Sequence, residues 1–269
     1  MEIYIPTRVN PARLHTPALL KAAGITFTLV VDNKQQAKAA QQLGYRRTMI
    51  TPNVDNLAAK RTAISAQHGK GWYISMDDNI CSFACVAPKY MRQTNLNTGD
   101  PSTHWRGIFN VLCSPVDYLA GLMLLQQQCS QHGTVYGGVA TMENPFFRGG
   151  GRYATHRFVK GKVYVMDAGP QLVFKHSMVE DSYMTALVLA HYGCVVVDKR
   201  MFYRCRWYEP GGHGNRLQRE QAGLLDRLQD IVNEFPGLVA IGRGNNTALR
   251  VLRTSTNGVN RWRREHGYL

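Results

Sequence analysis

Acidic residues are scarce in this sequence. Its 269 residues include 32 Lys and Arg but 18 Asp and Glu, which gives a formal net charge of +14 at pH 7. A surface with this excess of positive charge attracts polyanions, which include nucleic acid, nucleotide phosphates and an acidic membrane face. The charge does not choose among these partners. It also leaves open a basic protein that binds no nucleic acid, because net charge governs association and not fold.

Long apolar runs are absent as well. The longest apolar stretches fall far short of a membrane span. The first residues, MEIYIPTRVNPARLH, begin at once with a strand-like run and lack the apolar core and cleavage site of a signal peptide. No repeat or low-complexity linker divides the chain, and its length suits one large core. We therefore expect a single-domain cytoplasmic protein with no membrane partner, and no obligate protein partner is evident.

The cysteines form no dense framework of close pairs. We interpret them as free thiols in a reducing cytoplasm. Cys81 and Cys85 have three residues between them and could be two zinc ligands. No matching pair of Cys or His at ligand spacing follows, which favours a buried or incidental pair. The six are Cys81, Cys85, Cys113, Cys129, Cys194 and Cys205.

The first third of the sequence alternates between strand-like and helix-like segments. EIYIPTR alternates and ends at a proline, and TFTLVVDN is a nearly continuous β-branched run, typical of a strand covered on both faces. Asp55 or Asn56 is placed to cap the helix that precedes GWYISMDDNI. Strand and helix repeated at this spacing predict right-handed βαβ units and a largely parallel sheet. We expect helices at 11–23, 34–44 and 53–69, and strands at 2–8, 26–33, 46–51 and in GWYISMDDNI.

The second half is less regular. Helices are predicted at 114–133, 178–193 and about 216–234. TVYGGVAT predicts a strand or a turn, and residues 144–158 a loop rich in Gly and Arg. Further strands are expected in KVYVMDAG, PQLVFKH and CVVVDKRMFYRCRWY. The basic tail, residues 250–269, could be a flexible lid or arm.

Two adjacent carboxylates and an amide follow the strand in YISMDDNI. In an open parallel sheet, ligands bind outside the carboxyl ends of the strands, which is where Asp77, Asp78 and Asn79 fall. Carboxylates this close repel each other and need a cation, a basic side chain or a hydrogen-bond donor. Mg²⁺ or Mn²⁺ meets this need and leaves positions open for phosphate oxygens. A plain turn is the alternative, because Asp and Asn favour turns.

A second acidic pair and a histidine come later. Glu180 and Asp181 begin a predicted helix, where the macrodipole stabilises carboxylates and can keep one ionised as a base. Both residues could also be ordinary helix-start residues. His213 lies between glycines in WYEPGGHGN, in a loop whose backbone can approach a ligand closely. A lone loop histidine is usually not a ligand. His213 is a candidate because it follows the aspartate motif and the acidic pair in a fixed order along the sequence.

This order of features resembles the GT-A class of nucleotide-sugar glycosyltransferases. More narrowly, IYIPTR, NLAAKR, YISMDDNI, VEDSYM and WYEPGGHGN are similar to the TET/JBP-associated glycosyltransferases of bacteriophages, over most of residues 2–215. The resemblance implies an α/β fold, a GT-A-like (Rossmann-like) single domain with a mostly parallel central sheet flanked by helices. We expect this domain at 1–249, with a nucleotide-sugar half at about 1–113 and an acceptor half at about 114–249. The basic tail at 250–269 follows it.

The resemblance also assigns the metal and the base. Asp77 and Asp78 match the aspartate motif, which holds Mn²⁺ or Mg²⁺ on the sugar diphosphate, and Asp78 is the first choice for direct metal contact. Asn79 stands where many members have a third acidic group, which leaves the ligand set open. His213 would be the third protein ligand. In the pair Glu180 and Asp181, it is Asp181 that matches the base that takes the proton of the acceptor hydroxyl.

Five further positions match places where the class holds the nucleotide. Thr7 and Arg8 end the first strand, and Asp32 ends the second, where the class holds the base and ribose. Lys60 and Arg61 lie on the helix before the aspartate motif and could meet the diphosphate. A surface salt bridge or a helix cap is the alternative reading of each.

The resemblance implies a DNA-modifying enzyme. The phage family is thought to glycosylate hydroxymethylated pyrimidines in DNA, which predicts transfer of glucose from UDP-glucose to the hydroxyl of a 5-hydroxymethylpyrimidine, 5-hydroxymethylcytosine first. The charge of +14 suits salt-sensitive, sequence-independent contacts to DNA phosphates. FFRGGGRY could hold a flipped base or its phosphates. Both FFRGGGRY and NRWRREHGYL could equally be solvated segments.

Two other function classes stay open. A nucleotidyltransferase would use the carboxylates for metal-assisted attack on an α-phosphate and would release pyrophosphate. A non-enzymatic DNA-binding protein would carry the acidic clusters as structural features only.

Overall fold

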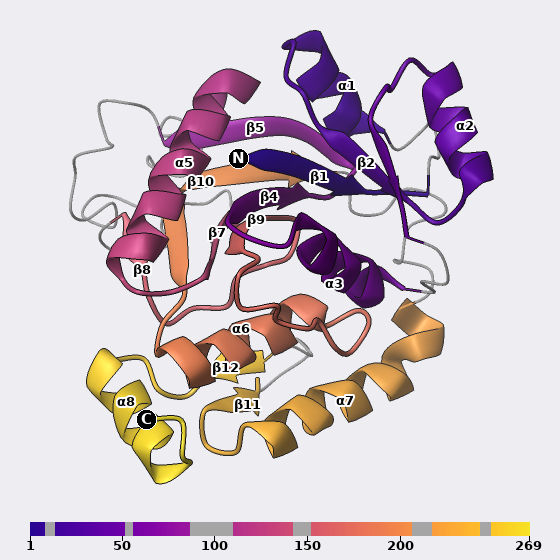
Figure 1. Ribbon diagram of the computed structural model, residues 1–269. Coiled ribbons are helices and arrows are strands. Elements are labelled where there is room, and N and C mark those ends of the chain that lie inside the picture. Colours follow the sequence, from indigo (N-terminus) through magenta and orange to yellow (C-terminus); the bar gives the residue numbers. More distant parts are fainter. Residues whose placement is uncertain (9–13, 52–55, 87–109, 142–151, 206–216, 243–248) are drawn as a thin grey trace.

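The computed structural model describes residues 1–8, 14–51, 56–86, 110–141, 152–205, 217–242 and 249–269 (Figure 1). The described chain begins with the predicted alternation of strands and helices. Asn56, one of the two predicted caps, starts its helix by accepting a hydrogen bond from the backbone N–H of Ala59. The first seven elements are β1 (Glu2–Pro6), α1 (His15–Ala22), β2 (Thr28–Val31), α2 (Lys34–Gln42), β3 (Thr48–Ile50), α3 (Leu57–His68) and β4 (Trp72–Met76).

The second half supplies the rest of the sheet and four more helices among the described residues. TVYGGVAT forms a strand, and the three predicted helices are present. The elements are β5 (Ile80–Val86), β6 (Asn110–Cys113), α5 (Pro115–Gln131), β7 (Tyr136–Ala140), β8 (Tyr153–Ala154), β9 (Val163–Asp167), α6 (Glu180–Tyr192), β10 (Val196–Cys205), α7 (Leu217–Glu234), β11 (Val239–Ile241), β12 (Leu249–Val251) and α8 (Thr256–Glu265).

The described strands form one large mixed sheet and a small two-stranded one. The large sheet has ten strands in the order β3-β2-β1-β4-β9-β7-β10-β5-β6, with β8 beside β10. The neighbours β3, β2, β1 and β4 are parallel, as the βαβ pattern predicts, and β10 is parallel to β7. β9, β5 and β8 run in the opposite direction. The predicted α/β class, with a central sheet whose strands run mostly one way, is confirmed.

Strand side chains alternate between two apolar cores. Tyr4 and Tyr73 point into a core shared with α3, α6, α7 and α8. Ile5 and Ile74 point into a second core, shared with α1, α2 and α5. Helices therefore cover both faces of the sheet, which explains why the strands are nearly continuous apolar runs. Figure 1 shows α6, α7 and α8 grouped at one side of the molecule, away from α1 and α2. Among the described residues, no helix is both long and apolar enough to span a membrane.

The prediction of a strand in PQLVFKH is wrong. Gln171 and His176 both adopt positive φ, at 52° and 56°, which interrupts an extended backbone. The backbone N–H of Phe174 donates to Thr62 Oγ1 on α3, at 2.9 Å, instead of to a neighbouring strand. The segment is therefore an irregular connection that packs along α3.

The basic tail is a packed element and not a flexible arm. β12 pairs with β11, and α8 packs on α6. Trp262 is buried, and its indole N–H donates to the carbonyl oxygen of Pro236 at 2.7 Å. Arg263 donates to the carbonyl oxygens of Ala190 and His191 in the last turn of α6, at 2.8 and 2.7 Å. Its charge therefore stabilises a helix C-terminus.

Candidate active site

Three parallel strands end at the same edge of the sheet and bring polar residues together there. β1 lies between β2 and β4, so the residues that follow each strand are neighbours across the edge. Thr7 follows β1, Asp32 follows β2, and Asp77 and Asp78 follow β4. The Thr7 hydroxyl donates to Asp78 Oδ2 at 2.8 Å. The prediction that the acidic pair lies at the carboxyl end of a parallel strand is confirmed.

Lys60 reaches this edge from α3. Its ammonium lies 2.6 Å from Asp32 Oδ1 and donates to the carbonyl oxygen of Thr7 at 3.0 Å. The residue is 5% exposed. Burial lowers the pKa of Lys60, and the carboxylate of Asp32 offsets part of that effect. Arg8 is exposed and close enough for its charge to lower this pKa as well.

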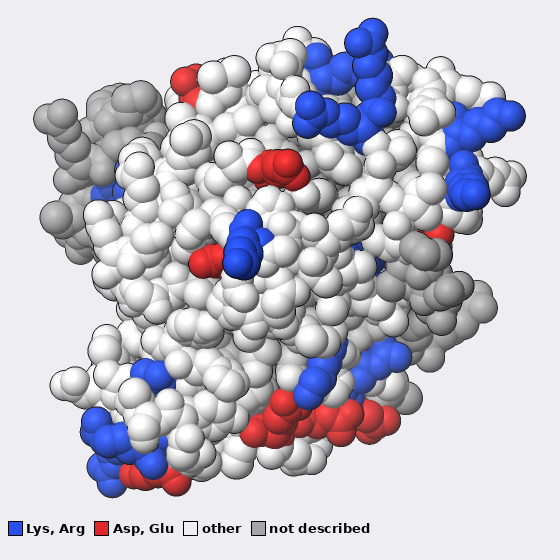
Figure 2. Space-filling view, in the orientation of Figure 1, with Lys and Arg blue, Asp and Glu red and all other residues white. Residues whose placement is uncertain are grey.

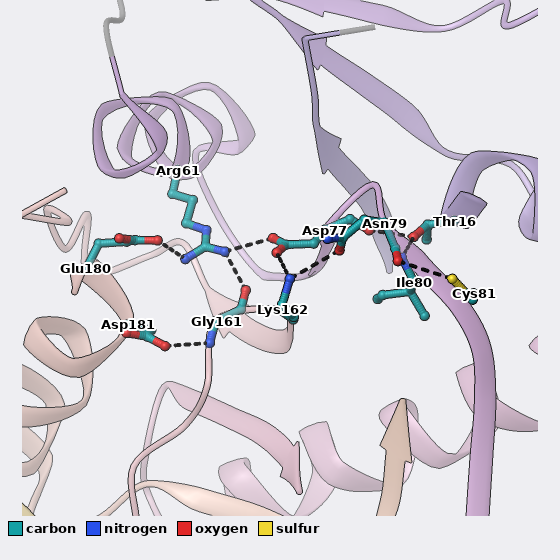
Figure 3. Close-up of polar contacts among 10 residues, drawn as sticks. All are labelled: Thr16, Arg61, Asp77, Asn79, Ile80, Cys81, Gly161, Lys162, Glu180 and Asp181. Atoms are coloured by element: carbon teal, nitrogen blue, oxygen red, sulfur yellow. Dashed lines mark hydrogen bonds and ion pairs between the residues drawn. The ribbon is translucent and has the colours of Figure 1, made fainter. Parts of the chain in front are cut away.

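Asp77 is held by two cations. Its Oδ1 accepts from Arg61 Nη2 at 3.1 Å, and its Oδ2 accepts from Lys162 Nζ at 3.0 Å. Lys162 also donates to the amide oxygen of Asn79 at 3.1 Å. Burial alone would raise the pKa of Asp77, but the charges of Lys162 and Arg61 outweigh it and lower the pKa. Figure 3 shows Lys162 between Asp77 and Asn79.

Thr16 fixes the turn that carries the acidic pair. Its backbone N–H donates to the carbonyl oxygen of Asp78 at 3.0 Å, and its hydroxyl donates to that of Asp77. The same hydroxyl accepts from the backbone N–H of Ile80 at 2.9 Å. The structure does have a turn at Asp78 and Asn79, which was the predicted alternative to a metal site. Thr16 ties this turn to α1.

Arg61 joins the acidic pair to the start of α6. The residue is 1% exposed. Its Nη1 donates to Glu180 Oε1 at 2.7 Å, and its Nη2 donates to Asp77 and to the carbonyl oxygen of Gly161 (Figure 3). The guanidinium also lies over the ring of Tyr164, 5.4 Å from its centroid. One buried side chain thus links α3, the exit of β4, the segment before β9 and α6.

Glu180 and Asp181 occupy the first turn of α6 in different surroundings. Glu180 is 5% exposed. Burial raises its pKa, and the charge of Arg61 offsets only part of this effect. Asp181 is partly exposed, and its Oδ2 accepts from the backbone N–H of Gly161 at 3.0 Å. Its Oδ1 accepts from the N–H of Ser182 at 2.7 Å. The start of the helix therefore carries one buried and one accessible carboxylate.

The donor set at the strand ends suits a hard divalent cation at Asp78 better than at Asp77. Asp78 is partly exposed, and carboxylate oxygens are the ligands that Mn²⁺ and Mg²⁺ prefer. Both oxygens of Asp77 already bond to cationic side chains. Within the described ranges, no group of three or more His, Cys, Asp or Glu side chains could hold a metal ion. His213, the expected third ligand, lies in 206–216, outside the described residues.

Sequence reasoning missed Lys162, Gly161 and Thr16. Lys162 and Gly161 precede β9, which is the antiparallel neighbour of β4, and the backbone N–H of Asp77 donates to the carbonyl oxygen of Lys162 at 2.8 Å. A glycine between lysines before a strand, in VKGKVYV, was the only signal in the sequence. The structure brings eight of the expected residues into one connected region: Thr7, Asp32, Lys60, Arg61, Asp77, Asp78, Glu180 and Asp181.

The six cysteines are all free thiols, and two of them, Cys81 and Cys205, lie beside the acidic turn. Burial raises the pKa of Cys113 to about 12, and that of its neighbour Cys85 is raised as well. Thiols with raised pKa values are poor nucleophiles and poor metal ligands at neutral pH.

Comparison with known proteins bears on the fold. No family model matches the sequence, and none of the curated proteins is similar to it. Among solved structures, glucosyl-3-phosphoglycerate synthase from Mycobacterium tuberculosis superposes with a TM-score of 0.54 at 8% identity, covering 93% of this chain and 88% of the other, in a complex with Mn²⁺, UDP-glucose and phosphoglyceric acid. A complex of that enzyme with Mn²⁺, UDP and glucosyl-3-phosphoglycerate gives 0.53 at 8% identity, covering 93% and 86%. At such low identity the likeness establishes the fold, which is GT-A-like.

Proposed function

We propose that this protein is a metal-dependent glycosyltransferase that moves glucose from UDP-glucose onto the hydroxyl of 5-hydroxymethylcytosine, or a related 5-hydroxymethylpyrimidine, in DNA. The observation that carries the proposal is the joining of the strand-end carboxylates to the carboxylates of α6 through Arg61. The proposed donor site and the proposed base for the acceptor would thus lie in one connected region. The GT-A-like enzyme that superposes on this chain was solved with Mn²⁺ and UDP-glucose, which supports the same donor chemistry here.

The strand-end edge would hold the donor. Thr7, Arg8 and Asp32 would bind the base and ribose of UDP, and Lys60 is placed between them. Asp78, assisted by Asp77 and with His213 as the third protein ligand, would hold Mn²⁺ or Mg²⁺, which when bound neutralises the charge of the diphosphate. Arg61 Nη1 and Nη2 already donate to Glu180, Asp77 and Gly161, so its role would be to position Asp77 and Glu180.

Asp181 would be the base. Asp181 is partly exposed in the first turn of α6, whereas Glu180 is buried against Arg61. As the acceptor oxygen forms its bond to the anomeric carbon, its proton would pass to Asp181. The bond from the anomeric carbon to the diphosphate breaks, and its electron pair leaves with UDP. Glu180 would fix the first turn of α6 and so the direction of the neighbouring carboxylate.

The positive charge supports a DNA acceptor. A net charge of +14 favours contacts to phosphates that do not depend on base sequence. On the face in Figure 2, Lys and Arg lie in separate groups with acidic side chains among them, and they do not form one continuous stripe. A DNA strand would therefore be held by particular cationic positions and not by that face as a whole.

The direct test is a transfer reaction read by mass. The protein is incubated with Mn²⁺, a panel of nucleotide sugars, and DNA with or without 5-hydroxymethylcytosine, and the digested nucleosides are weighed. We expect the mass of one hexose on the modified base alone, with UDP as the released product. Asp78→Ala should abolish metal-dependent binding of UDP-glucose in calorimetry. Release of pyrophosphate would indicate a nucleotidyltransferase, and no metal-dependent binding of any nucleotide sugar would refute the proposal.

A further inference from the structure

A second concentration of charge lies on β10, where its pairing with β7 breaks. Asp198 pairs with Val139, but the next paired residue is Phe202, with Ala140. Three residues of β10 therefore face one step of β7, and such bulges redirect side chains out of the regular ladder. Lys199 and Arg200 come from this bulge. The backbone N–H of Lys199 bonds to the carbonyl oxygen of Arg152 at 2.8 Å, which fixes the bulge against β8.

Arg200 is buried, and part of its guanidinium has no hydrogen-bond partner in the described part of the chain. The residue is 2% exposed, and its Nε and Nη1 have no hydrogen-bond partner among the described residues. Only its backbone N–H is seen to bond to a carboxylate, Asp198 Oδ1, at 2.9 Å. A buried charged donor without a partner is strongly unfavourable unless a ligand completes it. Nothing in the proposed transfer chemistry uses this side chain.

Among the described residues whose charges act on Lys199 and Arg200, cations outnumber carboxylates. Asp198 is fully buried, and its two oxygens are taken by Arg152 Nε at 3.0 Å and by the backbone N–H of Arg200. Burial and the charges of Arg157 and Arg200 lower the pKa of Lys199. Burial and the charge of Arg152 lower the pKa of Arg200, and the charge of Asp198 opposes them. Asp198 offsets part of the repulsion among these four cations, and a ligand with negative oxygens would reduce it further.

The position of the bulge separates it from the donor site. β10 ends near the acidic pair, because the charges of Lys162 and Asp77 act on Cys205. Arg200 lies five residues earlier on the same strand, which corresponds to roughly 16 Å at ~3.3 Å per residue. The diphosphate of a donor held at Asp78 does not extend that far. A polymeric acceptor does, because it carries a phosphate at every nucleotide.

We propose that Arg200, with Lys199 and Arg152 beside it, forms a phosphate subsite that binds a phosphodiester of the nucleic-acid acceptor away from the reacting nucleotide. This assignment rests on the proposed function for its choice of ligand. The subsite would fix the strand on the protein without reading its sequence, because phosphate contacts position a nucleic acid and base contacts specify it.

Binding to a short fluorescein-labelled DNA, single-stranded and duplex, tests the subsite. For Arg200→Gln we expect roughly tenfold weaker binding at ~100 mM salt, since a hydrogen bond to a charged group is lost. We also expect the slope of log K against log salt, measured between about 50 and 200 mM, to be shallower by about 0.7 to 0.9. Arg200→Lys should recover part of the affinity. Lys199→Gln gives a second test in which the buried guanidinium remains, with the same direction of change.

Arg46→Gln is the matched control. Arg46 is exposed and lies just before the amino end of β3, away from the carboxyl ends of the parallel strands. The same loss of charge there should leave the slope of log K against log salt unchanged. Thermal melting followed by circular dichroism checks that each variant is folded. Unchanged DNA affinity and slope in folded Arg200→Gln and Lys199→Gln would overturn the proposal. The proposal would also be overturned if Arg200→Gln lost binding of 3-phosphoglycerate while its DNA binding stayed intact. That result would assign the site to a small phosphorylated acceptor.

Calorimetry with UDP-glucose and Mn²⁺ separates this proposal from the proposed function. The subsite predicts that Arg200→Gln binds the donor as the parent does. If the parent shows no metal-dependent donor binding while its DNA affinity still depends on Arg200, the glycosyltransferase proposal fails and the phosphate subsite stands. Loss of donor binding in Arg200→Gln would instead place this side chain at the donor, and the subsite as described would be wrong.

Discussion

Replacing Arg61 by methionine tests the buried link between the strand ends and α6. Methionine keeps much of the volume of the side chain but removes the charge, so Asp77 retains Lys162 while Glu180 loses its cation. Glu180 is then a buried carboxylate that has two alternatives: to stay ionised without a partner, or to take up a proton. Breaking a buried pair by removing one partner typically costs about 3 to 5 kcal/mol.

Protonation sets a ceiling on the Glu180 part of that cost. The ordinary pKa of this carboxyl is 4.5, which is 2.5 units below pH 7, so neutralising it at pH 7 costs about 3.4 kcal/mol at ~1.36 kcal/mol per unit. At pH 5 the same step costs about 0.7 kcal/mol. The folded pKa of Glu180 is already raised in the parent, so the folded state favours the proton, and stability falls as the pH rises through that pKa. Arg61→Met should strengthen this trend.

Urea unfolding at pH 5, 6 and 7, followed by far-UV circular dichroism, measures the effect. We expect Arg61→Met to lower the free energy of unfolding by about 3 kcal/mol at pH 7 and by roughly 1 kcal/mol at pH 5. Arg61→Met combined with Glu180→Gln should recover most of the loss at pH 7. Lys175→Met, which removes a cation from a pair whose lysine is 51% exposed, is the control and should cost less than about 1 kcal/mol. A loss that is the same at every pH, or a double variant no more stable than the single one, would refute the buried link.

Three further outcomes follow from the same geometry. Asp181→Asn should lower kcat by about 10² to 10⁴-fold, as loss of a general base does, while calorimetry shows unchanged UDP-glucose affinity; the exposed Asp226→Asn is the matched control, and a kcat near that of the parent would remove Asp181 from this role. The pKa of Asp77 is lowered from 3.8 in the folded state, so its ionised form contributes stability that is lost as the pH falls through the folded pKa; Asp77→Asn should therefore lose less stability than the parent on acidification below about pH 4 in urea unfolding, and an equal loss would contradict the pairing. Asn56→Ala should lower the free energy of unfolding by about 1 kcal/mol through loss of the cap of α3, and no change would show that the cap does not contribute.

Local patterns were sufficient for most of the fold. The apolar runs of β1, β2 and β4 act within a few residues, as do Gly24, Gly44 and Gly69, which adopt positive φ just after α1, α2 and α3. The alternation of strands and helices could therefore be predicted. PQLVFKH could not, because its apolar side chains are strand-like while its backbone is bonded to Thr62, more than a hundred residues earlier in the chain. The prediction of a flexible arm at 250–269 failed because Arg263 has its partners in a distant part of the chain. The arginines of this tail indicate a solvated arm, but Arg263 bonds to the C-terminal carbonyls of α6.

The site was predictable where it depends on strand ends and hidden where it depends on strand order. A carboxylate after a buried parallel strand is at the ligand-binding edge whatever the rest of the sheet does. Lys162 joins the same cluster only because β9 inserts beside β4 in the antiparallel sense, and no local pattern reveals which strand will be that neighbour. Arg61 is similar. Its position on the helix before the aspartate motif suggested a diphosphate contact, whereas in the structure it is buried and bonds to Asp77 and Glu180.

The two adjacent aspartates are chemically different because the turn directs them to different partners. Asp77 faces α3 and β9, where Arg61 and Lys162 occupy both of its oxygens. Asp78 faces β1, where the neutral hydroxyl of Thr7 donates to it. A divalent cation at Asp77 would have to displace an ammonium that is already 3.0 Å away. Lys162 also bonds to Asn79, so an acidic residue at position 79 would draw the same ammonium and would not restore a free ligand. The amide at this position is therefore consistent with a metal held through Asp78 and by residues beyond the motif.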